Sequence, residues 1–174
     1  MKEVSEEDNN IRSVFCFGDK FAFVLRIIWF SLLLAFLIFF NIIQGAKGTL
    51  KSLMYFTIWG IYITTIYFFL LILSTFLANK LLDRIIEILF TIGVCSESLI
   101  SIFFWIILAP MIPKSWWENS LLVIVLIFSH SFPFLFLVLE LIYNQVFIER
   151  RNFIFLLIFG IFYMIVLVES TVIR

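Results

Sequence analysis

The only histidine of the chain, His130, lies within IFSHSFPFLF at residues 127–136, an apolar run that has no charged side chain. An imidazole can act as a general base, and it can also form a structural hydrogen bond. Other polar groups occur in equally apolar stretches: Thr57, Thr64 and Thr65 in YFTIWGIYITT, and Glu97 in CSES. Because a hydroxyl next to a base can act as a nucleophile, these residues are the candidates for chemistry.

The sequence lacks the usual signatures of other sites. It has no GxSxG, HExxH, CxxC or Walker motif, and one histidine argues against a zinc or di-iron centre, so we expect no metal and no cofactor. The net charge is zero without a basic patch, which argues against nucleic acid as a partner. Two cysteines, Cys16 and Cys95, imply no disulfide framework.

Composition sets the class of protein. Of the 174 residues 64% are hydrophobic, 24 are Phe, and only 14% are charged. A soluble domain of this length has too little interior to bury so much apolar surface. We therefore predict an all-α integral membrane protein.

The elements that must position the polar residues are membrane spans, each about 20 apolar residues long. We expect five, at about 21–43, 52–78, 85–112, 119–148 and 153–173. Their connections are short and polar: QGAKGTLK, NKLLDR, PKSWWE and ERRN. Short connections make consecutive helices antiparallel neighbours, so residues 21–174 should form one compact bundle after a polar N-terminal segment, residues 1–20.

The distribution of Lys and Arg predicts orientation, because cytoplasmic loops are enriched in these residues. The side that holds the N-terminus carries eight and the opposite side four, which favours a cytoplasmic N-terminus. The first apolar run is too long for a signal-peptide core and should stay as an anchor. The endoplasmic reticulum or the plasma membrane is the expected location.

Ionisable residues at membrane depth are costly and often functional, at about 2.5–3.5 kcal/mol when charged at the centre of a helix. Glu97 lies in the middle of the third span, and Glu169 lies toward the end of the fifth. On the fourth span a helical repeat of 100° per residue gathers one polar stripe: His130, Pro133, Leu137, Glu140 and Asn144. On the second span Thr57, Gly60 and Thr64 share a face that would admit another helix or a lipid chain closely.

Each candidate also has a purely structural interpretation. The three threonines can bond carbonyls of their own helix. Glu97 can be a protonated acid that bonds Ser98, Ser101 or a neighbouring backbone group. His130 can form an interhelical hydrogen bond that adds packing specificity.

Four segments resemble the androgen-induced-protein family, which includes the androgen-dependent regulator of tissue factor pathway inhibitor. They are LMYFTIW, which holds Thr57; FFWII at 103–107; HSFPFLFLVLE, which holds His130 and Glu140; and GIFY at 160–163. The resemblance covers residues 50 to 165. The family usually has six spans whereas five are expected here, and the segment from Thr57 to His130 is shorter than the family's.

The resemblance implies an intramembrane hydrolase that cleaves fatty acid esters of hydroxy fatty acids, with Thr57 as nucleophile and His130 as general base. Thr64 and Thr65 are reserve nucleophiles. Ser129 is a candidate oxyanion donor, and we conjecture from depth alone that Glu97 orients the imidazole. The expected spans place Thr57 about 5 residues and His130 about 11 residues below the outer surface, a difference of roughly 9 Å along the helices.

Two other function classes fit the same sequence. A non-enzymatic subunit or assembly factor of a membrane complex would use the buried polar groups to select partner helices, and a partner protein would supply a missing helix. A proton path would use Glu97, His130, Glu140 and Glu169 as relay groups, although we find no paired half-repeats of the kind that many transporters have.

Overall fold

The computed structural model describes residues 19–52, 55–77, 79–144 and 150–172. Regular structure within these residues is helical: α1 (Asp19–Ser52), α2 (Phe56–Ser74), α3 (Lys80–Phe103), α4 (Lys114–Trp117), α5 (Ser120–Asn144) and α6 (Phe153–Val172). Five of the helical stretches are long and apolar enough to cross a membrane. This confirms the prediction of an all-α, multi-pass protein; residues 1–18 with Cys16, and the side chains of Asn144 and Glu169, lie outside the description.

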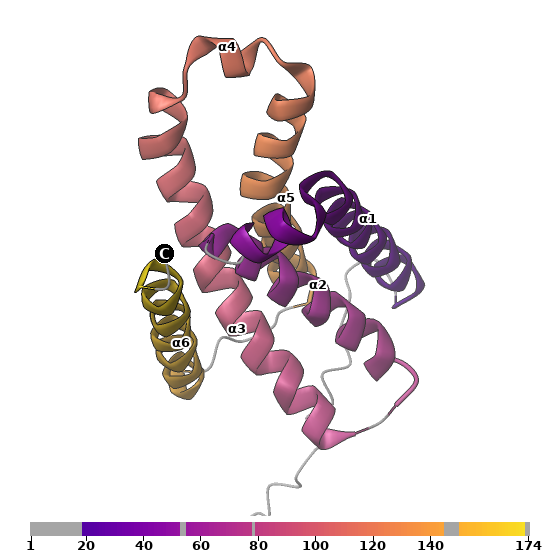
Figure 1. Ribbon diagram of the computed structural model, residues 1–174. Coiled ribbons are helices and arrows are strands. Elements are labelled where there is room, and N and C mark those ends of the chain that lie inside the picture. The colour runs from indigo at the N-terminus through magenta and orange to yellow at the C-terminus, as the bar shows by residue number, and fades with distance from the viewer. Residues whose placement is uncertain (1–18, 53–54, 78, 145–149, 173–174) are drawn as a thin grey trace, which may run out of the picture.

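Three helices form the centre of the bundle. α2, α3 and α5 contact one another, while α1 packs on α2 and α6 packs on α3. α3 and α5 form a long antiparallel hairpin that α4 closes, and α1 and α6 lie on opposite sides of this centre (Figure 1). In the stripe on the fourth span Pro133, Leu137 and Glu140 are buried, with Leu137 0% and Glu140 1% exposed, whereas His130 is half-buried.

Two of the expected connections are helical. α1 continues through QGAKGTLK to Ser52, and its break falls at Gly45, whose φ of 62° and ψ of 174° suit a residue without a Cβ. The second span therefore begins at Phe56 and not at residue 52. α3 begins at Lys80 within NKLLDR, because the Asn79 side chain accepts a hydrogen bond from the Leu81 N–H at 2.9 Å and caps the helix.

A buried ion pair joins α1 to α5. Arg26 donates from Nε and Nη2 to Glu140 Oε1 at 3.0 and 2.8 Å, and the two side chains are 8% and 2% exposed. Beside this pair Trp29 stacks on Phe136, with ring centroids 5.5 Å apart. Arg26 was one of the eight Lys and Arg residues counted on the N-terminal side, but in the structure it neutralises a carboxylate inside the bundle.

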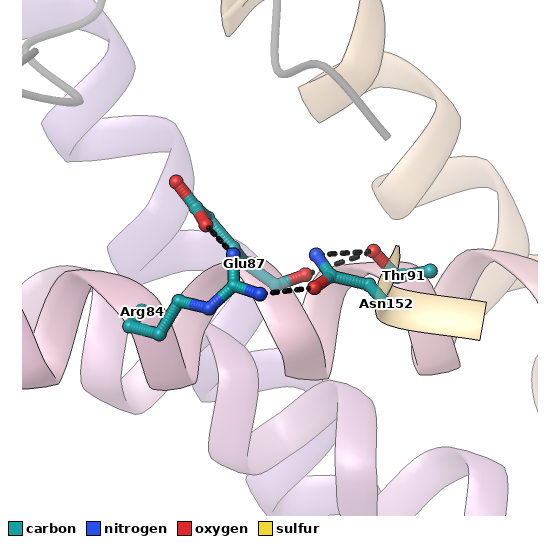
Figure 2. Close-up of polar contacts among 4 residues, drawn as sticks. All are labelled: Arg84, Glu87, Thr91 and Asn152. Carbon is teal, nitrogen blue, oxygen red and sulfur yellow. Dashed lines mark hydrogen bonds and ion pairs between the residues drawn. The ribbon is translucent and has the colours of Figure 1, made fainter. Parts of the chain in front are cut away.

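α6 is attached to α3 where α6 begins. Asn152 is fully buried, accepts from Arg84 Nη2 at 2.8 Å and donates to Thr91 Oγ1 at 3.5 Å. Arg84 also pairs with Glu87, and Thr91 donates to the Glu87 carbonyl, so four residues form one network (Figure 2). Farther along, aromatic contacts such as Phe56 with Tyr163 hold α6 against the start of α2.

We expect Arg26→Ala to lower the free energy of unfolding by about 3–5 kcal/mol, because it leaves the Glu140 carboxylate buried without a counter-charge. The measurement is thermal unfolding of the purified protein in detergent. Glu87→Gln is the matched control, since the Arg84–Glu87 pair is 30% and 27% exposed and should contribute about 1 kcal/mol or less. Equal losses in the two variants would contradict a dominant role for the buried pair.

Asn152→Ala should loosen the start of α6, because Arg84 and Thr91 each lose a hydrogen-bond partner. The exposed Arg150 and Arg151 lie directly before Asn152, so tryptic cleavage at these residues should become several-fold faster than in the unmodified protein. Asn41→Ala is the control, since the Asn41 amide donates to the Leu37 carbonyl of its own helix and to the Tyr62 hydroxyl of α2, and neither contact involves α6. An unchanged cleavage rate in Asn152→Ala would show that the network does not hold α6.

Candidate functional site

His130 lies in α5 and is held by stacking on α3. Its ring lies flat on Phe104, with centroids 3.7 Å apart and planes 5° apart. Its Nδ1 atom is buried without a hydrogen-bond partner, so the expected alternative of an interhelical hydrogen bond is not seen at this atom. The imidazole is therefore fixed in orientation while one nitrogen remains unused.

The backbone around His130 is irregular on both helices. Phe104 begins a π-helical segment, Phe104–Leu108, that coincides with the FFWII segment of the sequence. Such segments are frequent at functional sites. Trp105 Nε1 donates to Ser131 Oγ at 2.9 Å, which ties this segment to α5 directly beside His130. The aromatic residues at 103–107 stand out in the sequence, and two of them, Phe104 and Trp105, contact His130 and Ser131. The sequence did not indicate the π-helix.

The Ser129 hydroxyl donates to the Leu126 carbonyl of its own helix at 3.3 Å. Pro133 lies inside α5 and has no N–H, so the Ser129 carbonyl lacks the donor that the helix would otherwise supply. Next to His130, Ser129 therefore offers its carbonyl oxygen as a hydrogen-bond acceptor. Its hydroxyl is used locally and does not serve as an oxyanion donor in this arrangement.

The three threonines of α2 are in different environments. Thr57 is half-buried in the first turn, Thr64 is fully buried with no partner for Oγ1, and Thr65 donates to the Ile61 carbonyl at 2.7 Å. Thr65 follows the structural interpretation, because its hydroxyl satisfies the backbone of its own helix. Thr57 and Thr64 remain the candidates on this helix.

Glu97 of α3 lies against Gly60 of α2. It is 0% exposed, and neither carboxyl oxygen has a hydrogen-bond partner, although Ser98 and Ser101 are close in the chain. The Ser98 hydroxyl donates to the Val94 carbonyl instead. The Glu97 carboxyl is packed against Gly60, where a Cβ would collide with Glu97 Oε1 and would lie 2.9 Å from Ile100 Cδ1. Glu97 is not bonded to His130, so the conjectured orienting contact is absent.

These contacts define the relative levels of the candidates. Glu97 contacts Gly60 of α2, and Phe104 contacts His130 of α5, so each pair lies at one level of the bundle. Glu97 and Phe104 are seven residues apart along the chain. Thr57 precedes Gly60 by three residues and lies toward the same end of the bundle. At 1.5 Å per residue, Thr57 is about 6 Å from the level of His130, whereas Thr64 is about 16 Å away. The register favours Thr57 and separates Thr64 and Thr65 from the imidazole.

Glu140 belongs to the buried pair with Arg26 and is ten residues along α5 from His130. Its role here is to hold α1 against α5, not to orient the imidazole. Sequence reasoning missed this partner because it used Arg26 only in the count of Lys and Arg that predicted orientation. The sequence did contain a signal of a buried partner, because Arg26 is the seventh residue of an apolar stretch that begins at Lys20.

An apolar groove of about 840 Å³ lies beside the start of α2. It is lined by Phe56 and by α6 residues that include Leu157, Gly160 and Met164. Thr57 directly follows Phe56 in the chain but is not among the residues that line the groove. The groove is open to the outside of the bundle, where a membrane would supply hydrocarbon.

The fold is that of a multi-pass helical membrane protein. Its interior contains a π-helical segment and several buried polar atoms that lack hydrogen-bond partners. Comparison of the chain with protein-family models, with curated proteins and with solved structures found no match. Among the described residues, no group of three or more His, Cys, Asp or Glu side chains is placed to hold a metal ion.

Gly60→Ala should destabilise the protein by about 1–3 kcal/mol, because the new methyl group overlaps the buried Glu97 carboxyl and Ile100. Gly160→Ala is the matched control, since a Cβ there meets nothing within 4 Å. Thermal unfolding in detergent measures both. Equal stability of the two variants would contradict close packing at Gly60.

Proposed function

We propose that the protein is an intramembrane hydrolase of long-chain lipid esters, with Thr57 as nucleophile and His130 as general base. The observation that carries the proposal is the imidazole of His130, which is fixed on Phe104, has a buried and unpartnered nitrogen, and lies about one helical turn from the level of Thr57. The four segments that resemble the androgen-induced-protein family support it, because both residues lie in them.

In this mechanism Thr57 Oγ attacks the ester carbonyl while His130 accepts its proton. His130 then gives the proton to the leaving alcohol, and an acyl-threonine remains. Water, activated by the same imidazole, releases the fatty acid and restores Thr57. The two residues differ by about 6 Å in level along the helix axes, so proton transfer requires a bridging water or a shift of the side chains when substrate binds.

The substrate would enter from the bilayer. The groove lined by Phe56 and α6 is apolar and could hold a hydrocarbon chain. Thr57 is the residue after Phe56, and the ester would have to pass from the groove to its hydroxyl. Fatty acid esters of hydroxy fatty acids are the substrate class that the resemblance implies. We propose the endoplasmic reticulum or the plasma membrane as location, with a cytoplasmic N-terminus, because seven Lys and Arg remain on that side after Arg26 is removed from the count, against four on the other.

A second candidate function is a subunit or assembly factor of a membrane complex. It is favoured by α6, of whose apolar stretch 6% is buried, against 50% for α3. A partner protein that supplies a further helix would cover this surface. Isolation of the chain in a stable stoichiometric complex, with no ester hydrolysis by that complex, would favour this function over the first.

The hydrolase proposal is tested with a fluorophosphonate probe that labels activated hydroxyl nucleophiles. We expect the purified protein to be labelled, and expect Thr57→Ala and His130→Ala to lose at least nine tenths of the label while they stay folded.

Thr65→Ala is the control, because this hydroxyl already bonds the Ile61 carbonyl and lies deeper than the imidazole. Loss of label in Thr64→Ala or Thr65→Ala but not in Thr57→Ala would show that the nucleophile is wrongly assigned. No label in the unmodified protein, under conditions that label a related hydrolase, would contradict hydrolysis.

A further inference from the structure

Two carboxyl groups are buried in the part of the chain that the structure describes, Glu97 and Glu140, and their environments differ. Glu140 has Arg26 as its counter-charge, whereas Glu97 is completely buried and has no hydrogen-bond partner at either oxygen. It lies in the seam between α2 and α3, which is defined here by Gly60, Thr64, Gly93, Glu97 and Ile100. No part of the proposed hydrolase mechanism uses it.

Among the described residues, none with a positive charge contacts the Glu97 carboxyl group. α2 presents Gly60 and, one turn farther on the same face, the buried and unpartnered Thr64 hydroxyl.

The other ionisable groups of the packed helices are engaged or distant. On α2, the Tyr62 hydroxyl accepts from Asn41 of α1, and Tyr67 lies seven residues beyond Gly60. On α3, Cys95 is uncharged as a thiol, and Arg84 pairs with Glu87 ten residues before Glu97. On α5, His130 stacks on Phe104 and Glu140 pairs with Arg26.

A carboxylate without a counter-charge is strongly disfavoured in hydrocarbon, so such a group takes up a proton or binds a cation. The seam has too few oxygen atoms for a hard metal cation. It offers the two carboxyl oxygens and the Thr64 hydroxyl, whereas Ca²⁺ takes six to eight oxygen ligands and Mg²⁺ takes six. A proton needs one carboxyl oxygen and no further ligand.

We propose that the α2–α3 seam is a proton-binding site in which Glu97 is held as a neutral carboxylic acid at mid-membrane depth. Gly60 is what admits the carboxyl group between the helices, since a Cβ at that position would occupy its place. Being neutral, Glu97 does not balance charge on His130. The inference is independent of hydrolase activity, and it stands if that activity is absent.

Infrared spectroscopy of the full chain in lipid bilayers at neutral pH tests the proposal, because a neutral carboxylic acid has a C=O stretching band that a carboxylate lacks. We expect this band in the unmodified protein and expect Glu97→Gln to lose it. Glu140→Gln is the matched control: it removes a buried carboxylate that is paired with Arg26, and it should leave the acid band unchanged.

Glu97→Asp covers the case in which Glu97→Gln fails to fold. It keeps the acid and should shift the band to a different frequency. Absence of the acid band in the unmodified protein would overturn the proposal, as would a Glu97→Gln spectrum that loses carboxylate bands instead. A band that disappears in Glu140→Gln and persists in Glu97→Gln would overturn it as well.

Discussion

The packing of side chains against Gly60 of α2 and Gly93 of α3 is the constraint on which the rest of the structure depends. Glu97 and Ile100 of α3 fill the space at Gly60, and at Gly93 a Cβ would lie 3.2 Å from Leu137 of α5, so the two glycines bring all three central helices together. Hydrocarbon solvent gives helices no hydrophobic reason to associate, and small residues allow the close packing that replaces it. The register of this contact sets Glu97 opposite Gly60 and leaves Thr57 near the level of His130.

The buried polar groups then separate into two kinds. Arg26 with Glu140, and Asn152 with Arg84 and Thr91, are satisfied by partners on other helices, and they fasten the peripheral helices α1 and α6 to the centre. Thr64, Glu97 and His130 have buried atoms without partners, and all three lie on the central helices. An unsatisfied polar atom costs free energy, so such atoms persist mainly where function retains them. The peripheral pairs therefore account for assembly, and the central groups are where chemistry is to be sought.

Much of this arrangement follows from the sequence, because apolar run length and short connections determine helix number and antiparallel order. The stripe on the fourth span correctly placed Leu137 and Glu140 inward. What the sequence could not provide depends on contacts between distant residues. Arg26 entered only the charge count that predicted orientation, because only the folded chain brings Glu140 to it. Thr64 and Thr65 look alike in the sequence, yet rotation about the helix axis and the choice of rotamer give one a carbonyl partner and leave the other without. Gly45 was placed in a connection, whereas the helix resumes beyond it.

The central claim about function is that Thr57 is a nucleophile served by His130. The most direct measurement is to incubate the purified protein with an activated long-chain ester, stop the reaction within one turnover, and locate any acyl group by peptide mass mapping. The account predicts an acyl group on Thr57 that accumulates in the unmodified protein and is absent from His130→Ala. An acyl group on another residue, or ester hydrolysis unaffected by removal of His130, would contradict it.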